Sequence, residues 1–196
     1  MYINKFFKCI AIVTLLATAI APVSALTKQQ KKRAKAEEKI YKKEGWKTKP
    51  GSLPLLSQLE IVIEVQEERD DSGYPVWITA DASTKTSVYN AGKSSAILLA
   101  KNNLGLLIET ELGDDIAAAV INEDQGELSY GAIEKVKQKI KGHMSNTISN
   151  TWTIMDCYKP LDGGRMEVLV RIAIKRSDAI KQGVKVFREF EKEDDL

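Results

Sequence analysis

The chain has 196 residues, of which 29 are basic and 27 acidic, for a net charge of +2. This length and a hydrophobic content of 43% favour one ordinary globular domain over a fibrous or disordered chain. Two cysteines (Cys9 and Cys157) and one histidine (His143) exclude a disulfide framework and a zinc centre made of these residue types alone.

Residues 1–25 have the pattern of a secretory signal. Two lysines precede an uncharged apolar run (Cys9–Ala21), and small residues at 23–25 fit a cleavage site after Ala25. The run is shorter than the roughly 20 residues that span a bilayer, so an uncleaved anchor is the less favoured alternative. Cys9 begins the run instead of ending it, which disfavours a lipoprotein signal. We expect an exported protein, periplasmic or envelope-associated, with Cys157 as the single cysteine of the mature chain.

A basic arm follows the expected signal. Residues 26–50 contain ten basic and three acidic side chains, whereas residues 51–196 carry an excess of seven acidic ones. One interpretation is contact with an anionic envelope lipid or glycan through Lys31, Lys32, Arg33 and Lys35. The favoured interpretation is a solvated, partly helical leader, either free or folded back on its own acidic domain. Residues 27–43 predict a frayed or isolated helix outside the core, and residues 45–51 predict a linker.

Residues 52–69 fit two patterns. Ser52 as an N-cap, Pro54 in the first turn and apolar residues at helical spacing favour a helix. Alternation of apolar and polar residues from Leu59 to Gln66 favours a strand. We expect the helix, followed by a turn at residues 70–73.

The longest helix is predicted at Ser87–Leu112, after a strand at Tyr74–Thr84. Its apolar stripe consists of Ala96, Ala100, Leu104, Leu107, Ile108 and Leu112. Small residues in its first half, beginning with Ala91, predict close packing on a sheet. We expect this helix to end near Gly113 and a less regular stretch to follow at residues 116–128.

The C-terminal third predicts a helix, a hairpin and a second helix. An amphipathic segment has Ala132 or Ile133, Val136, Ile140 and Met144 on its inward face. Strands are expected at 147–158 and 165–175, joined by a turn that contains Gly163 and Gly164. Ser177 is expected to cap the last helix, with residues 189–196 fraying as an acidic tail.

These elements predict an α+β fold: a small antiparallel or mixed sheet, made of one strand plus a C-terminal hairpin, packed by a long central helix and flanking helices. The predicted organisation is a signal (1–25), a basic helical arm and linker (26–51), a single α+β domain (52–190) and an acidic tail (191–196).

No set of residues converges on a catalytic site. Cys157 and His143 could form a thiol nucleophile and its base, but Cys157 lies within a strand pattern and is expected to be buried and inert. The chain lacks G-x-S-x-G, phosphate-loop and dinucleotide motifs. We therefore expect no catalytic, cofactor or metal site.

Two further residue types are interpreted as structural. The acidic pairs 70–71, 114–115 and 194–195 lack the alternating spacing of a calcium loop and are expected to be solvated. Trp46 is expected in an exposed linker, whereas Trp77 and Trp152 are expected to pack on strands. Export and an acidic body also disfavour nucleic acid as a partner.

The segments Tyr74–Ala82, Ala91–Leu104 and Ile108–Thr110 resemble the LPP-twenty family of bacterial envelope lipoproteins, which in turn resembles the N-terminal module of the flagellar assembly T protein. The resemblance covers roughly residues 53–174, as a strand, an Ala-rich helix, a second helical stretch and a hairpin. It implies a non-catalytic α+β envelope domain and gives no catalytic residues. This chain differs from that family because it lacks a lipobox cysteine.

The sequence therefore favours an exported, non-enzymatic envelope protein that acts as an interaction or assembly module, with an envelope protein or a second copy as partner. The alternative is a protein that binds anionic envelope lipid or glycan through the basic arm. The first hypothesis predicts an exposed apolar groove or sheet edge in place of a polar pocket.

Overall fold

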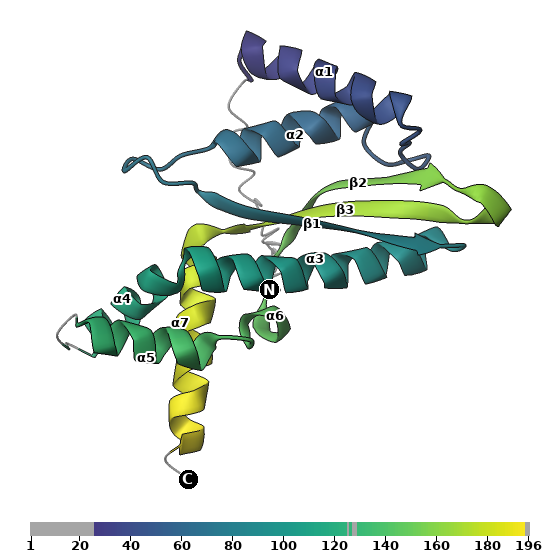
Figure 1. Cartoon of the computed structure of the whole chain (residues 1–196). Helices are drawn as coiled ribbons and strands as arrows, with labels where there is room; N and C mark the ends of the chain where they lie inside the picture. Colours follow the sequence, from purple (N-terminus) through teal and green to yellow (C-terminus); the bar gives the residue numbers. More distant parts are fainter. Residues whose placement is uncertain (1–25, 125, 127–128, 195–196) are drawn as a thin grey trace, which may run out of the picture.

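The computed structural model describes residues 26–124, 126 and 129–194, so the expected signal segment lies outside the described residues. In these residues, a three-stranded antiparallel sheet has helices on both faces, which is an α+β fold (Figure 1). Two helices cover one face, the long helix covers the other, and four more helices lie below it. The predicted fold class is confirmed.

The sheet is formed by β1 (Trp77–Thr86), β2 (Trp152–Pro160) and β3 (Met166–Lys175). Its order is β1-β3-β2, which leaves β1 and β2 as edges. The predicted hairpin joins β2 to β3, and Gly163 and Gly164 have the positive φ values that this turn needs. β2 begins at Trp152 and not at the predicted residue 147, because Thr147 ends the short helix α6 (Met144–Thr147) and residues 148–151 form a loop.

On the upper face in Figure 1, α1 (Lys28–Lys43) packs on α2 (Leu55–Glu67), which packs on β2. The ambiguous segment is thus a helix, as expected. Its N-cap is Pro54, however, so the predicted role of Ser52 was wrong.

The expectation of an isolated arm was also wrong. Ala34 of α1 is fully buried against α2, and Arg33 pairs with Glu67 at 2.6 Å. The predicted linker is docked as well, because Lys47 and Tyr158 exchange two backbone hydrogen bonds and Trp46 is only 8% exposed. Trp46 contacts Tyr41 and Lys159 instead of facing solvent.

On the lower face lies α3 (Tyr89–Glu111). The predicted apolar stripe is buried, apart from the partly exposed Leu107. Ala91 is exposed, and the closest approach to the sheet is made by Gly92, where a Cβ would lie 2.4 Å from the Thr86 side chain. The absence of a side chain therefore lets the start of α3 pack directly under β1.

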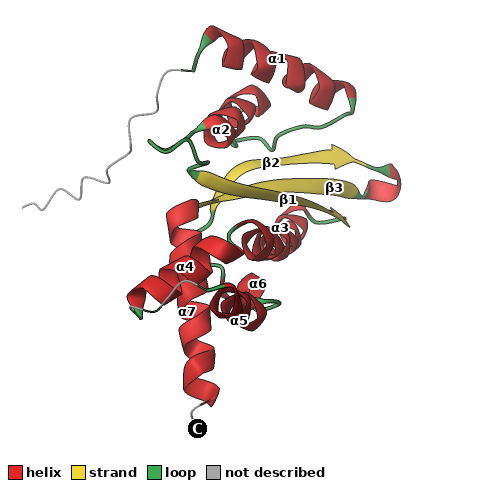
Figure 2. Ribbon diagram, turned by 60° about the vertical axis from the view of Figure 1, so that its left-hand side comes forward, coloured by secondary structure: helices red, strands yellow, loops and turns green. Residues whose placement is uncertain are grey.

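Below α3 lie α4 (Gly113–Glu123), α5 (Tyr130–Ile140) and α6, with α7 (Arg176–Asp194) crossing them (Figures 1 and 2). The prediction of an irregular stretch after Gly113 was wrong, because α4 begins there and buries Ile116 and Val120. The predicted end of the last helix near residue 189 was also wrong, since α7 continues to Asp194; the final two residues of the predicted tail lie outside the described residues. The first residue of α7, Arg176, directly follows β3, so Ser177 lies inside the helix and not at its cap.

The core has two parts, one on each face of the sheet. The upper cluster joins α2 to Ile154, Met155 and Cys157 of β2. The larger lower cluster joins α3 and the other lower helices to Val168, Val170 and Ile172 of β3. None of the helices in the described residues has the length and apolar composition that crossing a membrane requires.

Candidate interaction surfaces

The outer surface of α3 is uncharged and partly apolar. Six exposed residues lie within a sector of about 100° at the helical turn angle, and we call them the α3 outer face: Ala91, Ser95, Leu98, Leu99, Asn102 and Leu106. Leu98, Leu99 and Leu106 are 61%, 43% and 60% exposed. Large apolar side chains grouped on one exposed surface are typical of a contact site for another molecule.

The outer edge of β1 lies beside this face. Arg176 N–H donates to the Val76 carbonyl over 2.8 Å, and the β1–β3 register then runs without a shift. Because alternate residues of an antiparallel pair point their backbone groups to opposite sides, residues 79, 81, 83 and 85 point theirs away from β3. In the described part of the chain, these four amides have no hydrogen-bond acceptor, and one carbonyl of this edge, that of Asp81, accepts from the Asn103 side chain at 2.9 Å.

Asn103 also shows how the two surfaces are related. It lies on α3 beside the outer face and reaches the free edge of β1. Thr84, further along β1, donates to the Gly92 carbonyl at 2.9 Å. The α3 outer face and the β1 edge therefore form one continuous side of the molecule.

A second exposed surface is the basic face of α1. At the helical turn angle, seven lysines fall within a sector of about 120° beside and opposite the buried Ala34. We call them the α1 lysine face: Lys28, Lys31, Lys32, Lys35, Lys39, Lys42 and Lys43. Lys42 is paired with Glu38 at 2.7 Å, and the others have no ion pair to a described residue.

The residues predicted to contact an anionic surface are divided by this arrangement. Lys31, Lys32 and Lys35 belong to the α1 lysine face. Arg33 lies elsewhere on the helix and is paired with Glu37 at 3.1 Å and with Glu67 at 2.6 Å. Arg33 therefore joins α1 to α2, and Lys28, Lys39 and Lys43 take its place in the basic surface.

The structure does not bring Cys157 and His143 together. Cys157 is fully buried between the sheet and α2, where burial, with a smaller contribution from the Asp156 charge, raises the pKa of its thiol to about 12. His143 is exposed on the opposite side of the sheet and packs edge-on against Phe190, at a centroid distance of 4.3 Å. A thiol nucleophile activated by this histidine is thus excluded by geometry.

One polar cluster has no counterpart in the sequence interpretation. The Tyr89 hydroxyl donates a hydrogen bond to Asp156, and the Lys93 ammonium donates to the same oxygen at 3.0 Å. Burial first, and this hydrogen bond second, raise the pKa of Tyr89 far above its usual value. The tyrosine therefore stays protonated, and the cluster ties the start of α3 to the edge strand β2.

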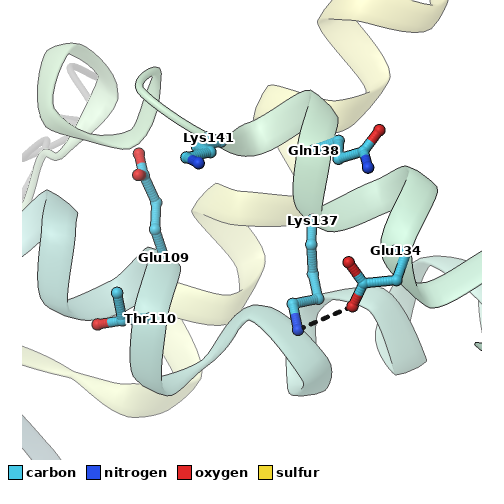
Figure 3. Close-up of a pocket in the computed structure, with 6 residues that line it drawn as sticks. All are labelled: Glu109, Thr110, Glu134, Lys137, Gln138 and Lys141. Carbon is cyan, nitrogen blue, oxygen red and sulfur yellow. Dashed lines mark ion pairs between the residues drawn. The ribbon is translucent and has the colours of Figure 1, made fainter.

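A pocket of about 310 Å³ lies between α3 and α5 (Figure 3). It is lined by Glu109, Thr110, Glu134, Lys137, Gln138 and Lys141. Glu109 accepts from the backbone amides of Gly142 and Met144, and Lys137 pairs with Glu134 and Asp114. Glu109 therefore joins α3 to the segment at the start of α6, and Lys137 joins α5 to α4 while also pairing within its own helix.

The acidic pairs 70–71 and 114–115 and the tryptophans mainly have structural contacts, whereas the pair 194–195 lies partly outside the described residues. Asp70 accepts from two amides of its own turn, and Asp115 pairs with Arg176. Trp77 packs on Trp152 at a centroid distance of 5.9 Å, although Trp152 remains 45% exposed. No group of three or more His, Cys, Asp or Glu side chains able to hold a metal ion occurs in the part of the chain that the structure describes.

Comparison of the chain with protein-family models, with curated proteins and with solved structures finds no match. The candidate surfaces therefore rest on their own geometry and chemistry.

Proposed function

We propose that this protein is an exported, non-catalytic envelope protein whose domain acts as an interaction or assembly module. The observation that carries the proposal is the α3 outer face, an uncharged and partly apolar surface that continues into an unpaired strand edge. Both features bind protein chains: apolar helix faces bury side chains, and strand edges offer a row of backbone hydrogen bonds.

Further observations support this proposal. The buried thiol is held protonated, and the one histidine lies on the other side of the sheet. Of the charges around the α3–α5 pocket, Glu109 and Lys137 make contacts between helices. The apolar segment at residues 1–25 supports export, and the resemblance to the LPP-twenty family supports a place in the envelope.

Capture from solubilised envelope tests the proposal. The chain is purified from cells that express the full sequence, and the wild type is compared with a Leu99→Glu, Leu106→Glu double variant. Leu53→Glu is a matched control, because Leu53 is 56% exposed and lies next to α2, on the face of the sheet opposite α3. We expect one protein to be retained by the wild type and by the control but lost with the double variant. Equal capture by all three chains would contradict the proposal.

A second candidate function is contact with an anionic envelope surface. It is favoured by the α1 lysine face, which groups seven cations on the outside of a docked helix above an acidic body. Each lysine near an anionic membrane contributes roughly 1 kcal/mol. Because α1 is held on α2, these charges are displayed together and not on a mobile arm.

Binding to phosphatidylglycerol vesicles, with phosphatidylcholine vesicles as reference, tests this candidate. Charge reversal of Lys31, Lys32 and Lys35 should abolish association, whereas reversal of three exposed lysines on α5 and α7 (Lys135, Lys181 and Lys185) should change it little. Vesicle binding that survives charge reversal on α1 would show that the α1 lysine face does not bind the anionic surface.

A further inference from the structure

We propose that two copies of this chain pair through the free edges of β1, antiparallel and centred on Ser83, so that two three-stranded sheets become one sheet of six strands. This inference rests on the proposed function and names its partner: a second copy. The outward backbone groups of β1 provide the ladder, because residues 79, 81, 83 and 85 point theirs away from β3.

The register follows from charge. When Ser83 lies opposite its own symmetry mate, Asp81 lies opposite Lys85 of the other copy, and Lys85 lies opposite Asp81. Opposite charges directly across an antiparallel pair are favourable, and like charges are unfavourable. Pairing centred on Asp81 or on Lys85 would instead set like charges against each other. Pairing centred on Ala82 or on Thr84 would leave both charges opposite uncharged residues, so the register centred on Ser83 is the one that pairs Asp81 with Lys85.

The neighbouring strands extend this charge pattern. Within one copy, Glu167 of β3 is opposite Lys85 and is paired with Lys159 of β2 at 3.2 Å. Arg171 of β3 is opposite Asp81, at 3.6 Å from its carboxylate. Across the joined sheet the signs would alternate in the order Lys159, Glu167, Lys85, then Asp81 and Arg171 of the second copy.

The same pairing covers the margin of the α3 outer face that adjoins β1. Two contacts fix how α3 lies along β1: Thr84 meets Gly92, and Asp81 meets Asn103. The part of α3 beneath Ser83 is therefore the part between residues 92 and 103. In this part, Leu99 is the outer-face leucine on the side of β1, about 40° from Asn103 at the helical turn angle, whereas Leu98 points away from that side. A twofold axis at Ser83 therefore places Leu99 beside Leu99 of the second copy.

Asn103 is compatible with this arrangement. Its amide takes one lone pair of the Asp81 carbonyl, and a carbonyl oxygen has a second one for an amide of the other copy. The exposed charges on β1 would, in a monomer, discourage unspecific strand pairing. In the proposed dimer they permit one partner and one register.

Charge exchange tests the register. Sedimentation equilibrium is measured on the wild type, on Asp81→Lys, on Lys85→Asp and on an equimolar mixture of the two variants. Each variant alone sets like charges opposite each other twice, which should weaken the dimer about tenfold or more. In the mixture, both charge pairs across the interface are again of opposite sign, and the changed contacts to Arg171 and Glu167 within each chain are the same as in the separate variants, so a heterodimer should form much more tightly than either variant alone. A monomeric wild type, or a mixture as weak as its components, would overturn the proposal.

A cysteine at the axis provides a test that leaves the charges unchanged. Opposite residues of a hydrogen-bonded antiparallel pair have Cα atoms about 5.5 Å apart, which suits a disulfide. Ser83→Cys should therefore be cross-linked almost fully under mild oxidation. Thr79→Cys is the matched control, since it would lie about 26 Å from its mate. The native Cys157 is buried and does not compete. Failure of Ser83→Cys to cross-link, or equal cross-linking of both variants, would overturn the pairing.

These outcomes are separable from those of the envelope capture. A monomeric chain that still loses a captured protein on Leu99→Glu, Leu106→Glu substitution would overturn self-pairing and leave the interaction module standing. A dimer with the predicted charge exchange would support self-pairing even if no other envelope protein is captured.

Discussion

The side chain of Gln58, on α2, accepts a hydrogen bond from the backbone amide of Asp156, on the edge strand β2, over a distance of 2.7 Å. Its amide group donates to the Leu53 carbonyl at 2.8 Å. Gln58 is only 2% exposed, so one buried polar side chain satisfies an edge strand and the start of a helix together. The two edges of the sheet are thus treated differently: β2 is covered by α2 and the Lys47 segment, whereas β1 is open.

Replacing Gln58 with Ala should therefore destabilise the fold by about 1–3 kcal/mol, because it leaves the partly buried Asp156 amide and the Leu53 carbonyl without this partner. Chemical denaturation measures this difference in unfolding free energy. Gln66→Ala on the same helix is the control, since that side chain is more exposed, and it should change stability little. Equal effects of the two substitutions would contradict the role given to Gln58.

Gly105 and Gly131 should respond oppositely to alanine. A Cβ at Gly105 would lie 2.6 Å from the Ser145 backbone nitrogen, where α3 meets α6, while a Cβ at Gly131 would have no neighbour within 4 Å. Gly105→Ala should cost about 1–3 kcal/mol through overpacking. Gly131→Ala, near the start of α5, should be neutral or stabilise by up to about 1 kcal/mol. Thermal unfolding of both variants measures these changes in stability. Changes of the same sign and size for both would refute the close α3–α6 contact.

Cys157 should make stability fall in alkaline solution. Burial raises the pKa of its thiol from 9.0 to about 12, so the unfolded chain ionises first as pH rises. The contribution is complete below pH 9.0 and is lost progressively towards pH 12. Denaturant midpoints should therefore fall less for Cys157→Val than for the wild type across this window. Parallel curves for the two chains would show that the thiol does not contribute, since Tyr89, whose pKa is also raised, remains in both.

Docking of α1 should depend on one small side chain. Ala34 is fully buried against α2, whereas Ala36 is exposed on the same helix. Ala34→Asp should release α1 and make trypsin cleave at its lysines about tenfold faster or more, which corresponds to a loss of at least about 1.4 kcal/mol in docking. Ala36→Asp should leave cleavage unchanged. If both variants are cut at the wild-type rate, α1 is not held through Ala34.

Periodicity predicted the elements that bury a wide apolar stripe. In α2, Leu55, Leu59, Val62 and Ile63 recur at helical spacing, and all are buried. The competing strand pattern in this segment arises because Ile61, a β-branched residue on the other side of the helix, fills an alternate position. The length of the segment and its start at Pro54 made helix the correct choice.

The missed helix α4 shows where sequence interpretation failed. Gly113 and the acidic pair after it look like a helix end followed by a turn. In the structure, Leu112 ends α3 and caps α4 at once, with Asp114 and Asp115 in the first turn of α4, where negative charge is favourable. The spacing of Ile116, Val120 and Ile121 was a signal for this helix.

The candidate surfaces were predictable only in part. The excess of lysine in α1 is evident in the sequence, but its docking is not, because a single alanine makes the most buried contact. The three outward leucines of α3 stand outside the predicted core stripe and were a usable signal. The free edge of β1 could not be predicted from the sequence, since strand order depends on tertiary packing.

Residue-resolved amide hydrogen exchange along β1 can show whether the free edge of this strand is paired with a second copy. The inward amides of Ile78, Ala80 and Ala82 are bonded to β3 and should be protected in any state of the protein. If two copies pair with Ser83 at the axis, the outward amides of Asp81, Ser83 and Lys85 are also protected in the wild type, and Asp81→Lys removes their protection alone. Outward amides that exchange freely in the wild type, beside protected inward ones, would contradict the pairing of this edge.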